Sequence, residues 1–479
     1  MIELEDTLPT ITDAEQEEEV RTDRRGIFVA SVIIFLAAVE NAIVGIGEFP
    51  YMQEIDKEST NEFFGIAMSI SRVSQAFSAL LFAMICQTRQ TYRTPLIVGR
   101  LIALLACILY LNVEHLKGGR RYLMAVCYSL FCTASGSNVI IRSYVSAISS
   151  HSDRSDAFSL FNGAYMLASV IGPMAQMMFS SVKYPGVEFL PDMKFHIYSA
   201  PIWIAAVTNF LSIAVIKLYL RELPRRGDTS FESLKDKIAM FRWQTFSRKI
   251  SGLLTVLNWK LILVCFGQKM LQTLSVVTLY TIVSMILKTS FGWTNAEATV
   301  AISKTMTGVG VLAIVTIFVY LFAGFGRRFS ERYIYLLGLA VFVGFYLISY
   351  PWEMMSSPVA VYNATAATGC KFSWCPSSYV PPASLFLVSI VVAMGFGLPL
   401  LSITLDSMYS KILGSMDQNM MQSIFVVADN IIHIITPIYS ADVYTWFGLE
   451  VVWGCNGFIT VVGTIFWILY LSDFSKYSS

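Results

Sequence analysis

Long apolar runs separated by short polar loops recur along the whole chain. They lie at 27–49, 63–85, 96–113, 122–149, 158–180, 197–220, 260–286, 297–325, 333–351, 384–410, 421–442 and 451–471. A hydrocarbon core about 30 Å thick needs roughly 20 apolar residues per helical crossing, and these runs are too long to be strands. None alternates apolar and polar residues as the strands of a membrane barrel do. The pattern predicts an all-α membrane protein with twelve transmembrane helices.

Polar segments divide these runs into two sets of six. Residues 1–25 form an acidic tail without the basic start of a signal peptide, and we expect it to be a disordered cytosolic arm. Residues 26–220 and 260–471 form the predicted N-terminal and C-terminal six-helix bundles, and 472–479 is a short cytosolic tail. Between the bundles, 221–259 combines basic residues with apolar residues at near-helical spacing, which predicts an amphipathic linker helix.

Composition agrees with a membrane protein and excludes several other classes. Only 14% of the 479 residues are charged and 55% are hydrophobic, whereas soluble proteins carry roughly 25% charged residues. The net charge of +1 gives no field that would hold nucleic acid. The sequence has no phosphate-binding loop, no metal-ligand spacing among its four histidines and no serine-hydrolase elbow. We therefore expect no enzyme, no cofactor and no metal. The expected partners are the bilayer and a small-molecule or anion substrate, and we expect a monomer.

The loops indicate which way the chain is oriented. Most of the 34 basic residues fall on the side of the N-terminus, which favours cytosolic N- and C-termini. On the opposite side, the long loop 352–383 carries an N-glycosylation sequon at Asn363, although a lone sequon also arises by chance. Cys370 and Cys375 in the same loop are candidates for a disulfide. These features are typical of a lumenal or extracellular segment.

An internal repeat relates the two halves. Shifting the chain by 264 residues aligns 142–173 with 406–437 without a gap. Identical residues then coincide at Ser143/Ser407, Ser146/Ser410, Ile148/Ile412, Asp153/Asp417, Ser159/Ser423, Phe161/Phe425, Ala164/Ala428, Ile171/Ile435 and Pro173/Pro437. Such a duplication predicts two parallel halves related by an axis along the membrane normal.

Several motifs resemble those of the major facilitator superfamily. Loop 87–93 keeps the basic residues of the family's loop after the second helix but lacks its acid and glycines. Gly172 and Pro173, with Ser159 and Ala168, match a fifth-helix element of the family that otherwise lacks its closing glycines here. Segments that resemble a lysosomal branch of the family are 95–98, 138–144, 374–375 and 409–414.

This resemblance implies a fold and a function. The implied fold is two six-helix bundles, and the implied function is secondary transport of a small solute across the lysosomal or endosomal membrane by alternating access, with proton coupling left open. A chloride-conducting anion channel of the lysosomal membrane is the alternative, and a non-transporting receptor on the same scaffold is a third possibility. Fold alone does not identify a solute.

Ionisable residues inside the predicted helices are the candidate functional residues, because each costs roughly 2.5 kcal/mol or more at mid-bilayer unless it has a partner or faces a cavity. The resemblance implies that helices one, four, seven and ten line a central cavity, and these carry Glu40, Arg142, Lys269 and Asp406. We expect Glu40 and Lys269, near mid-span, to face the substrate or coupling ion. We expect Arg142 and Asp406 to form a cytosolic gate. The alternative is two static pairs within the halves, Glu40 with Arg142 and Lys269 with Asp406.

A second candidate set lies on the helices that meet between the halves. Arg72 is on the second predicted helix, while Asp429 and His433 share one face of the eleventh. The sequence predicts an Arg72–Asp429 bridge, with a proton-responsive His433–Asp429 pair as the alternative. The glycine- and proline-containing run 395–399 would bend or break the tenth helix near the cavity; close packing against a neighbouring helix is the commoner reason for such a run, and a moving hinge is the alternative.

Overall fold

The structure is a computed structural model, and it describes most of the chain. The described residues are 22–56, 58–59, 61–116, 118–150, 152–179, 182, 186–190, 193–222, 258–322, 324–360, 362, 369–414 and 418–477. The acidic tail up to residue 21, the linker 223–257 and the sequon at Asn363 lie outside them, so the predictions made there stay predictions.

The N-terminal half is a bundle of helices with one hairpin. It contains α1 (Arg24–Ile55), α2 (Asn61–Arg89), α3 (Arg93–Leu111), a 3-10 turn (Val113–His115), α4 (Arg120–Ser135), α5 (Asn138–Ile148), α6 (Arg154–Met178), the strands β1 (Val187–Leu190) and β2 (Met193–Phe195), and α7 (Ala200–Tyr219). The predicted run 122–149 is divided into α4 and α5 at Gly136. A Cβ at Gly136 would collide with Ser78 Oγ and the backbone of Ala79, so glycine here lets α2 pack closely against the break.

The C-terminal half repeats this plan with its own irregularities. It contains α10 (Trp259–Thr289), α11 (Asn295–Phe322), α12 (Phe325–Arg328), α13 (Glu331–Ser349), β3 (Ser357–Pro358), a 3-10 turn (Cys375–Ser377), β4 (Tyr379–Val380), α14 (Ala383–Val392), a π-helical segment (Ala393–Gly397), α15 (Leu398–Leu413), α16 (Asn419–Leu469) and a 3-10 turn (Asp473–Lys476). The π-helical segment falls where the sequence predicts a bend.

The long helix α16 is divided by one residue. Its 51 residues cover the last two predicted spans, and Gly448 interrupts them with non-helical angles, φ 84° and ψ −174°. The indole of Trp374 lies against Gly448 and donates from Nε1 to the carbonyl of Thr445 at 3.1 Å. Trp374 comes from the loop that the Cys370–Cys375 disulfide closes. The disulfide therefore belongs to a loop that packs on the break in α16.

Membrane crossing is supported by the length and composition of the helices. Within the described residues, 10 helical stretches are long and apolar enough to span a bilayer, and α16 counts as a single stretch among them. The all-helical membrane fold is therefore confirmed, whereas the number twelve stays a prediction.

Gly448→Ala should destabilise the protein, because the backbone has positive φ and an added Cβ would approach Trp374 to 2.8 Å. We expect a loss of about 1–3 kcal/mol, measured as a lower midpoint of thermal unfolding in detergent. Gly454→Ala is the matched control, since a Cβ there meets no atom within 4 Å. Equal midpoints for the two variants would contradict the strain at Gly448.

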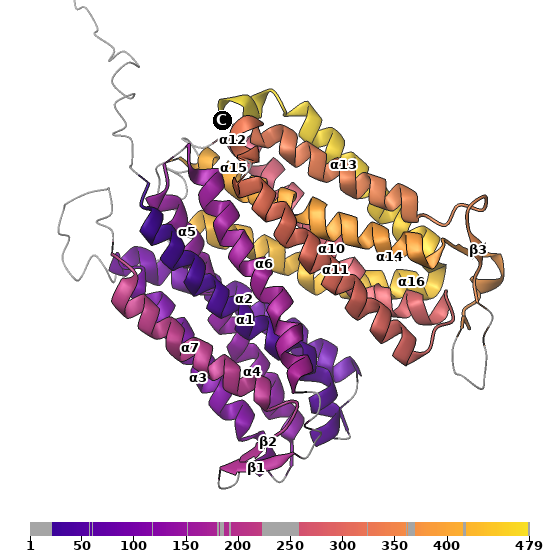
Figure 1. Ribbon diagram of the computed structural model, residues 1–479, viewed down its shortest axis with the longest axis horizontal. Coiled ribbons are helices and arrows are strands. Elements are labelled where there is room, and N and C mark those ends of the chain that lie inside the picture. Colours follow the sequence, from indigo (N-terminus) through magenta and orange to yellow (C-terminus); the bar gives the residue numbers. More distant parts are fainter. Residues whose placement is uncertain are drawn as a thin grey trace, which may run out of the picture.

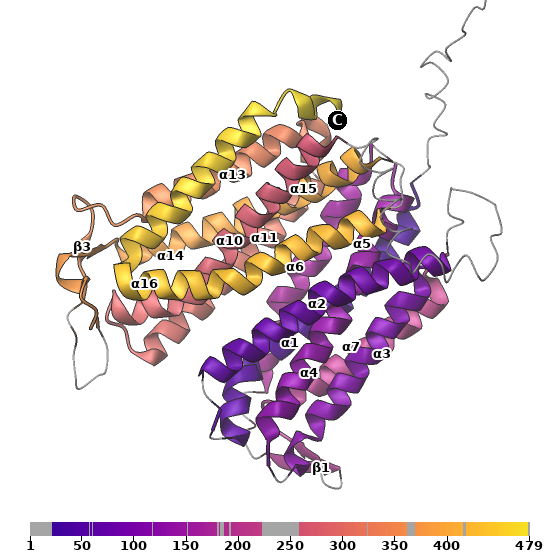
Figure 2. The same cartoon turned by 180° about the vertical axis from the view of Figure 1, so that it is seen from behind.

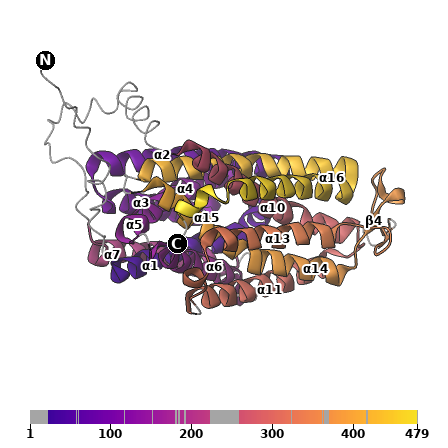
Figure 3. The ribbon, with the colours of Figure 1, turned by 90° about the horizontal axis from the view of Figure 1, so that it is seen from above.

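The two halves meet at one end and diverge toward the other (Figure 1). We call the end where α1 begins and α5 and α15 finish the closed end, and the end carrying the strands β1 to β4 the hairpin end. The most extensive contacts between the halves are α2 with α16 and α6 with α11, and α6 also contacts α15. The pair α2 and α16 is seen from behind in Figure 2, and Figure 3 shows this pair and the pair α6 and α11 on opposite sides of the molecule.

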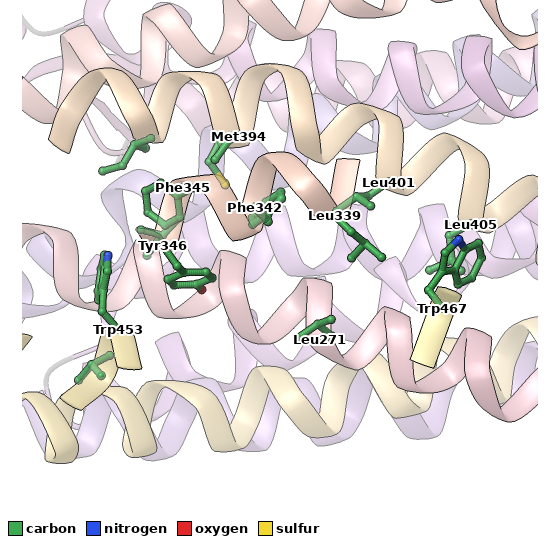
Figure 4. Close-up of a cluster of buried hydrophobic side chains, with 14 of the residues drawn as sticks. Leu271, Leu339, Phe342, Phe345, Tyr346, Met394, Leu401, Leu405, Trp453 and Trp467 are labelled. Atoms are coloured by element: carbon green, nitrogen blue, oxygen red, sulfur yellow. The ribbon is translucent and has the colours of Figure 1, made fainter. Parts of the chain in front are cut away.

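Each half has its own packed core. In the C-terminal half, side chains from α10, α13, the π-helical segment and α16 interlock, among them Leu271, Phe342, Met394 and Trp453 (Figure 4). Trp453 Nε1 donates to Ser349 Oγ at 2.7 Å, so the buried indole is satisfied. Because lipid tails are as apolar as these side chains, close packing and such hydrogen bonds hold the half together. The N-terminal half has separate clusters of its own.

Candidate central cavity

A cavity of about 530 Å³ lies between the two halves. Its walls come from α1, α2, α4, α5 and α6 on one side and from α10, α15 and α16 on the other. Five ionisable side chains of the predicted set line it, namely Arg72, Arg142, Lys269, Asp429 and His433. A cavity of this size, with few charged groups among apolar ones, is typical of a small-molecule site.

An ion pair between the halves lies at the closed-end side of the cavity. Arg142 Nη1 on α5 is 2.8 Å from Asp406 Oδ1 on α15, and the Asp406 side chain is only 4% exposed. Asn162 Nδ2 on α6 donates to the other carboxylate oxygen at 3.2 Å. The Arg142 guanidinium also lies 5.8 Å from the centre of the Phe161 ring. Both carboxylate oxygens are therefore bonded, which offsets much of the cost of burying the charge.

One helical turn further toward the closed end, a second pair of repeat-related residues meets. Ser146 Oγ and Ser410 Oγ are 2.5 Å apart, and they are separated by the same 264 residues as Arg142 and Asp406. Arg154 Nη1 donates to the carbonyl of Ser410 at 3.2 Å. Since 142 and 146, like 406 and 410, are four residues apart, α5 and α15 present equivalent faces to each other. The repeat axis therefore passes between these two helices.

The prediction that Glu40 faces the central cavity is wrong. Glu40 is 2% exposed, is absent from the described cavity lining, and lies 3.2 Å from Arg100 Nη1 on α3. Arg100 also donates to Asn209, to Asn138 and to the carbonyl of Ala134, so its guanidinium joins α3 to α1, α4, α5 and α7. The static alternative, Glu40 with Arg142 and Lys269 with Asp406, is not formed. The sequence contained Arg100 inside a span but gave no sign of its partner.

The predicted Arg72–Asp429 bridge is not formed either. Lys269 Nζ on α10 lies 4.0 Å from Asp429 Oδ1 on α16, and the Thr273 hydroxyl donates to the same carboxylate. These two helices pack within one half, so Lys269 reaches Asp429 more readily than a residue across the cavity does. Arg72 instead donates to the side chain of Gln75 at 3.0 Å. His433 Nδ1 is 3.1 Å from the Asp429 carbonyl and 3.9 Å from its carboxylate.

Sequence reasoning also missed a fully buried pair outside the cavity. Lys411 Nζ lies 3.1 Å from Glu331 Oε1, and neither side chain is exposed. Ser407 Oγ donates to the same oxygen at 2.8 Å. The only available signal was the spacing of Ser407 and Lys411, which places them on one face of a helix. This pair links α13 to α15 near the closed end.

Two helical halves that enclose a polar cavity at a repeat axis have the architecture of secondary transporters. The family model described as the Major Facilitator Superfamily matches residues 30–380, and the chain belongs to that family. The chain is 22% identical to major facilitator superfamily domain-containing protein 8 of Xenopus laevis, over 93% of this chain and 92% of that protein. The resemblance to this branch is therefore confirmed.

Three solved structures that share this fold are described as transporters or as a homologue of one. The fucose transporter FucP in the outward conformation is 15% identical, with a TM-score of 0.64 over 92% of this chain and 98% of that one. A bacterial homologue of the iron transporter ferroportin in the outward-facing state gives 0.63, with 10% identity over 93% and 98% of the two chains. The human organic anion transporter MFSD10 gives 0.60, with 14% identity over 93% and 99%. The alternative of a chloride channel finds no support in these relatives.

Proposed function

We propose that this protein is a secondary transporter that moves a small solute across the lysosomal or endosomal membrane by alternating access. The observation that carries the proposal is a cavity between two repeat-related halves whose closed-end contacts include Arg142–Asp406 and Ser146–Ser410. An ion pair suits such a gate, because it is weak when hydrated and stronger when water is excluded. Two states of similar free energy can then interconvert.

The direction of the cavity follows from the loops. With the termini cytosolic, as the basic residues favour, the closed end is cytosolic and the cavity faces the lumen. The Cys370–Cys375 disulfide near the hairpin end supports an oxidising compartment on that side. The lysosomal assignment is supported by the resemblance of segments such as 138–144 to the lysosomal branch.

The proposal is tested by profiling small solutes in lysosomes isolated from cells that lack the protein. A solute should accumulate, return to its normal level when the wild type is re-expressed, and stay high with Arg142→Asp. Whole-organelle recordings in chloride and in an impermeant anion should remain electrically silent. A large chloride current that Arg142→Ala and Lys269→Ala reduce would instead establish the channel.

His433→Gln tests whether protons take part. His433 Nδ1 lies 3.9 Å from the Asp429 carboxylate on its own helix, and the residue lines the same cavity as Arg72 on α2 and Lys269 on α10. If His433 binds a proton from the acidic lumen, the net charge of the cavity changes, and efflux should depend on lumenal pH between about 5 and 7. We expect His433→Gln to flatten that dependence while leaving transport at neutral pH within about twofold. An unchanged pH profile would remove His433 from the mechanism.

A further inference from the structure

Among the described residues, one basic side chain of the cavity has no acidic partner. Arg142 is paired with Asp406, and Lys269 lies 4.0 Å from Asp429. Arg72 donates to the neutral amide of Gln75, and among the described residues no carboxylate lies within 4.0 Å of it. A cation inside a membrane protein is costly unless it is paired or hydrated. An incoming anion would therefore bind Arg72 without first having to break an ion pair there.

Lys269 is positioned to share such an anion. Its ammonium group is only loosely paired with Asp429, since 4.0 Å exceeds hydrogen-bond distance. Arg72 on α2 and Lys269 on α10 come from opposite halves and line the same cavity. A ligand held between them would contact both halves at once. Binding of that kind can affect the movement of one half relative to the other.

The rest of the lining indicates a ligand larger than an inorganic ion. The volume of about 530 Å³ falls in the range of small-molecule sites, whereas one water occupies about 30 Å³. Five aromatic residues line the cavity, Tyr128, Phe131, Phe161, Tyr165 and Phe425, of which Tyr165 is 49% exposed and the other four at most 4%. Lys269 Nζ lies 6.0 Å from the centre of the Phe425 ring. The lining around the positive charge is therefore largely apolar, with Tyr165 as its accessible ring.

We propose that the solute is an organic monoanion. Its anionic oxygen group binds between Arg72 and Lys269, and its apolar or aromatic body packs against the apolar lining and the accessible ring of Tyr165. That this ligand is the transported solute rests on the proposed function, whereas its binding in the cavity does not require transport. Chloride fits poorly, because it would leave most of the volume to water.

The labelling rate of a native cysteine measures the charge preference of the cavity even when the ligand is unidentified. Cys132 lines the cavity and is half-buried, while Cys86, Cys107, Cys127 and Cys265 are buried. The exposed Cys455 is removed by Cys455→Ser. In this background, the reaction of Cys132 is timed with two methanethiosulfonates of similar size, one carrying a sulfonate and the other a trimethylammonium group. Each rate is divided by the rate of the same reagent with 2-mercaptoethanol.

We expect the corrected rate of the sulfonate reagent to exceed that of the cationic reagent by about tenfold, the order expected for one unit charge at close range in a partly hydrated site. Arg72→Gln should reduce the ratio several-fold, and Arg72→Lys should retain it, which separates charge from a general effect on folding. Arg89→Gln is the matched control, because Arg89 is exposed at the end of α2 outside the cavity. Cys132→Ser should abolish labelling.

A ratio near one, or a preference for the cationic reagent, would overturn the proposal. Ser135→Cys gives a second reporter in the same lining, and failure of both cysteines to react would also overturn it. These outcomes are distinct from failure of the transport function. If a neutral or cationic solute accumulates in lysosomes lacking the protein, the transport proposal holds and the anion proposal fails. If the cavity prefers the anionic reagent but no solute accumulates, the anion proposal holds and the transport proposal fails.

Discussion

Arg142→Asp should open the closed end of the cavity and so expose Cys132 to reagents from the side of the chain termini. The substitution replaces the 2.8 Å pair with two acids that face each other, Asp406 and the new carboxylate. Breaking a buried pair costs about 3–5 kcal/mol, enough to reverse a preference of a few kcal/mol between two conformations. In membrane vesicles of known orientation, labelling from that side should therefore rise at least about tenfold. Asp406→Arg should behave in the same way.

The charge swap distinguishes direct pairing from general damage. Arg142→Asp combined with Asp406→Arg restores opposite charges, and Asn162 can rotate its amide so that its oxygen accepts from the new arginine. We expect protection of Cys132 to return to within about threefold of the wild type. A double variant that labels as fast as either single variant would show that the two residues are not direct partners.

Ser146→Ala provides a graded control at the same interface. It removes the contact with Ser410, a neutral hydrogen bond worth about 1 kcal/mol, and keeps the bond from Ser410 Oγ to Gln418. Labelling of Cys132 from the terminal side should rise by only a few-fold. The order of effects, with the ion pair first and the serines second, is what a gate held mainly by Arg142 and Asp406 requires.

The internal repeat was the most informative feature of the sequence for the cavity. It places Arg142 and Asp406 at one equivalent position, and residues near a twofold axis meet their own equivalents. The contact between Ser146 and Ser410 follows from the same rule, one helical turn away. The pairing at the repeat axis could thus be predicted from sequence, because symmetry constrains it without knowledge of helix orientation.

Helix orientation is what the sequence could not supply. A membrane helix is apolar on its lipid face and on its packed face alike, so periodicity does not show which face is buried. Glu40 on α1 was therefore expected in the cavity, although it faces Arg100 on α3. The Lys269–Asp429 contact was missed for the same reason, since choosing between Lys269 and Arg72 requires the rotation of α2 and α10.

The prediction of where helices end was limited by a related ambiguity. The sequence predicted separate spans at 421–442 and 451–471, whereas α16 continues between them and has non-helical backbone angles at Gly448. The connecting residues are largely apolar, so composition does not mark them as a loop. The break is fixed by the contact of Gly448 with Trp374, a residue distant in sequence.

Arg100→Leu should be the most destabilising single substitution in the N-terminal half among those considered. Arg100 is 2% exposed and bonds Glu40 at 3.2 Å, Asn209 at 3.4 Å and Asn138 at 3.1 Å. Its loss leaves Glu40 buried without its cation and frees contacts among α1, α3, α5 and α7. We expect a loss of about 3–5 kcal/mol, observed as a much lower unfolding midpoint in detergent and reduced yield.

Two further variants show whether the loss of stability comes from breaking the Glu40–Arg100 ion pair or from losing the other hydrogen bonds of Arg100. Arg89→Leu removes an exposed arginine and should leave the midpoint nearly unchanged. Glu40→Leu combined with Arg100→Leu removes both charges and should be more stable than Arg100→Leu alone, because no uncompensated charge remains. A double variant no better than the single one would mean that the hydrogen bonds to Asn209 and Asn138 matter more than the ion pair. Since Glu40 and Arg100 lie outside the cavity lining, Cys132 in the double variant should keep its preference for the anionic reagent, which separates the stability of the N-terminal half from the chemistry of the cavity.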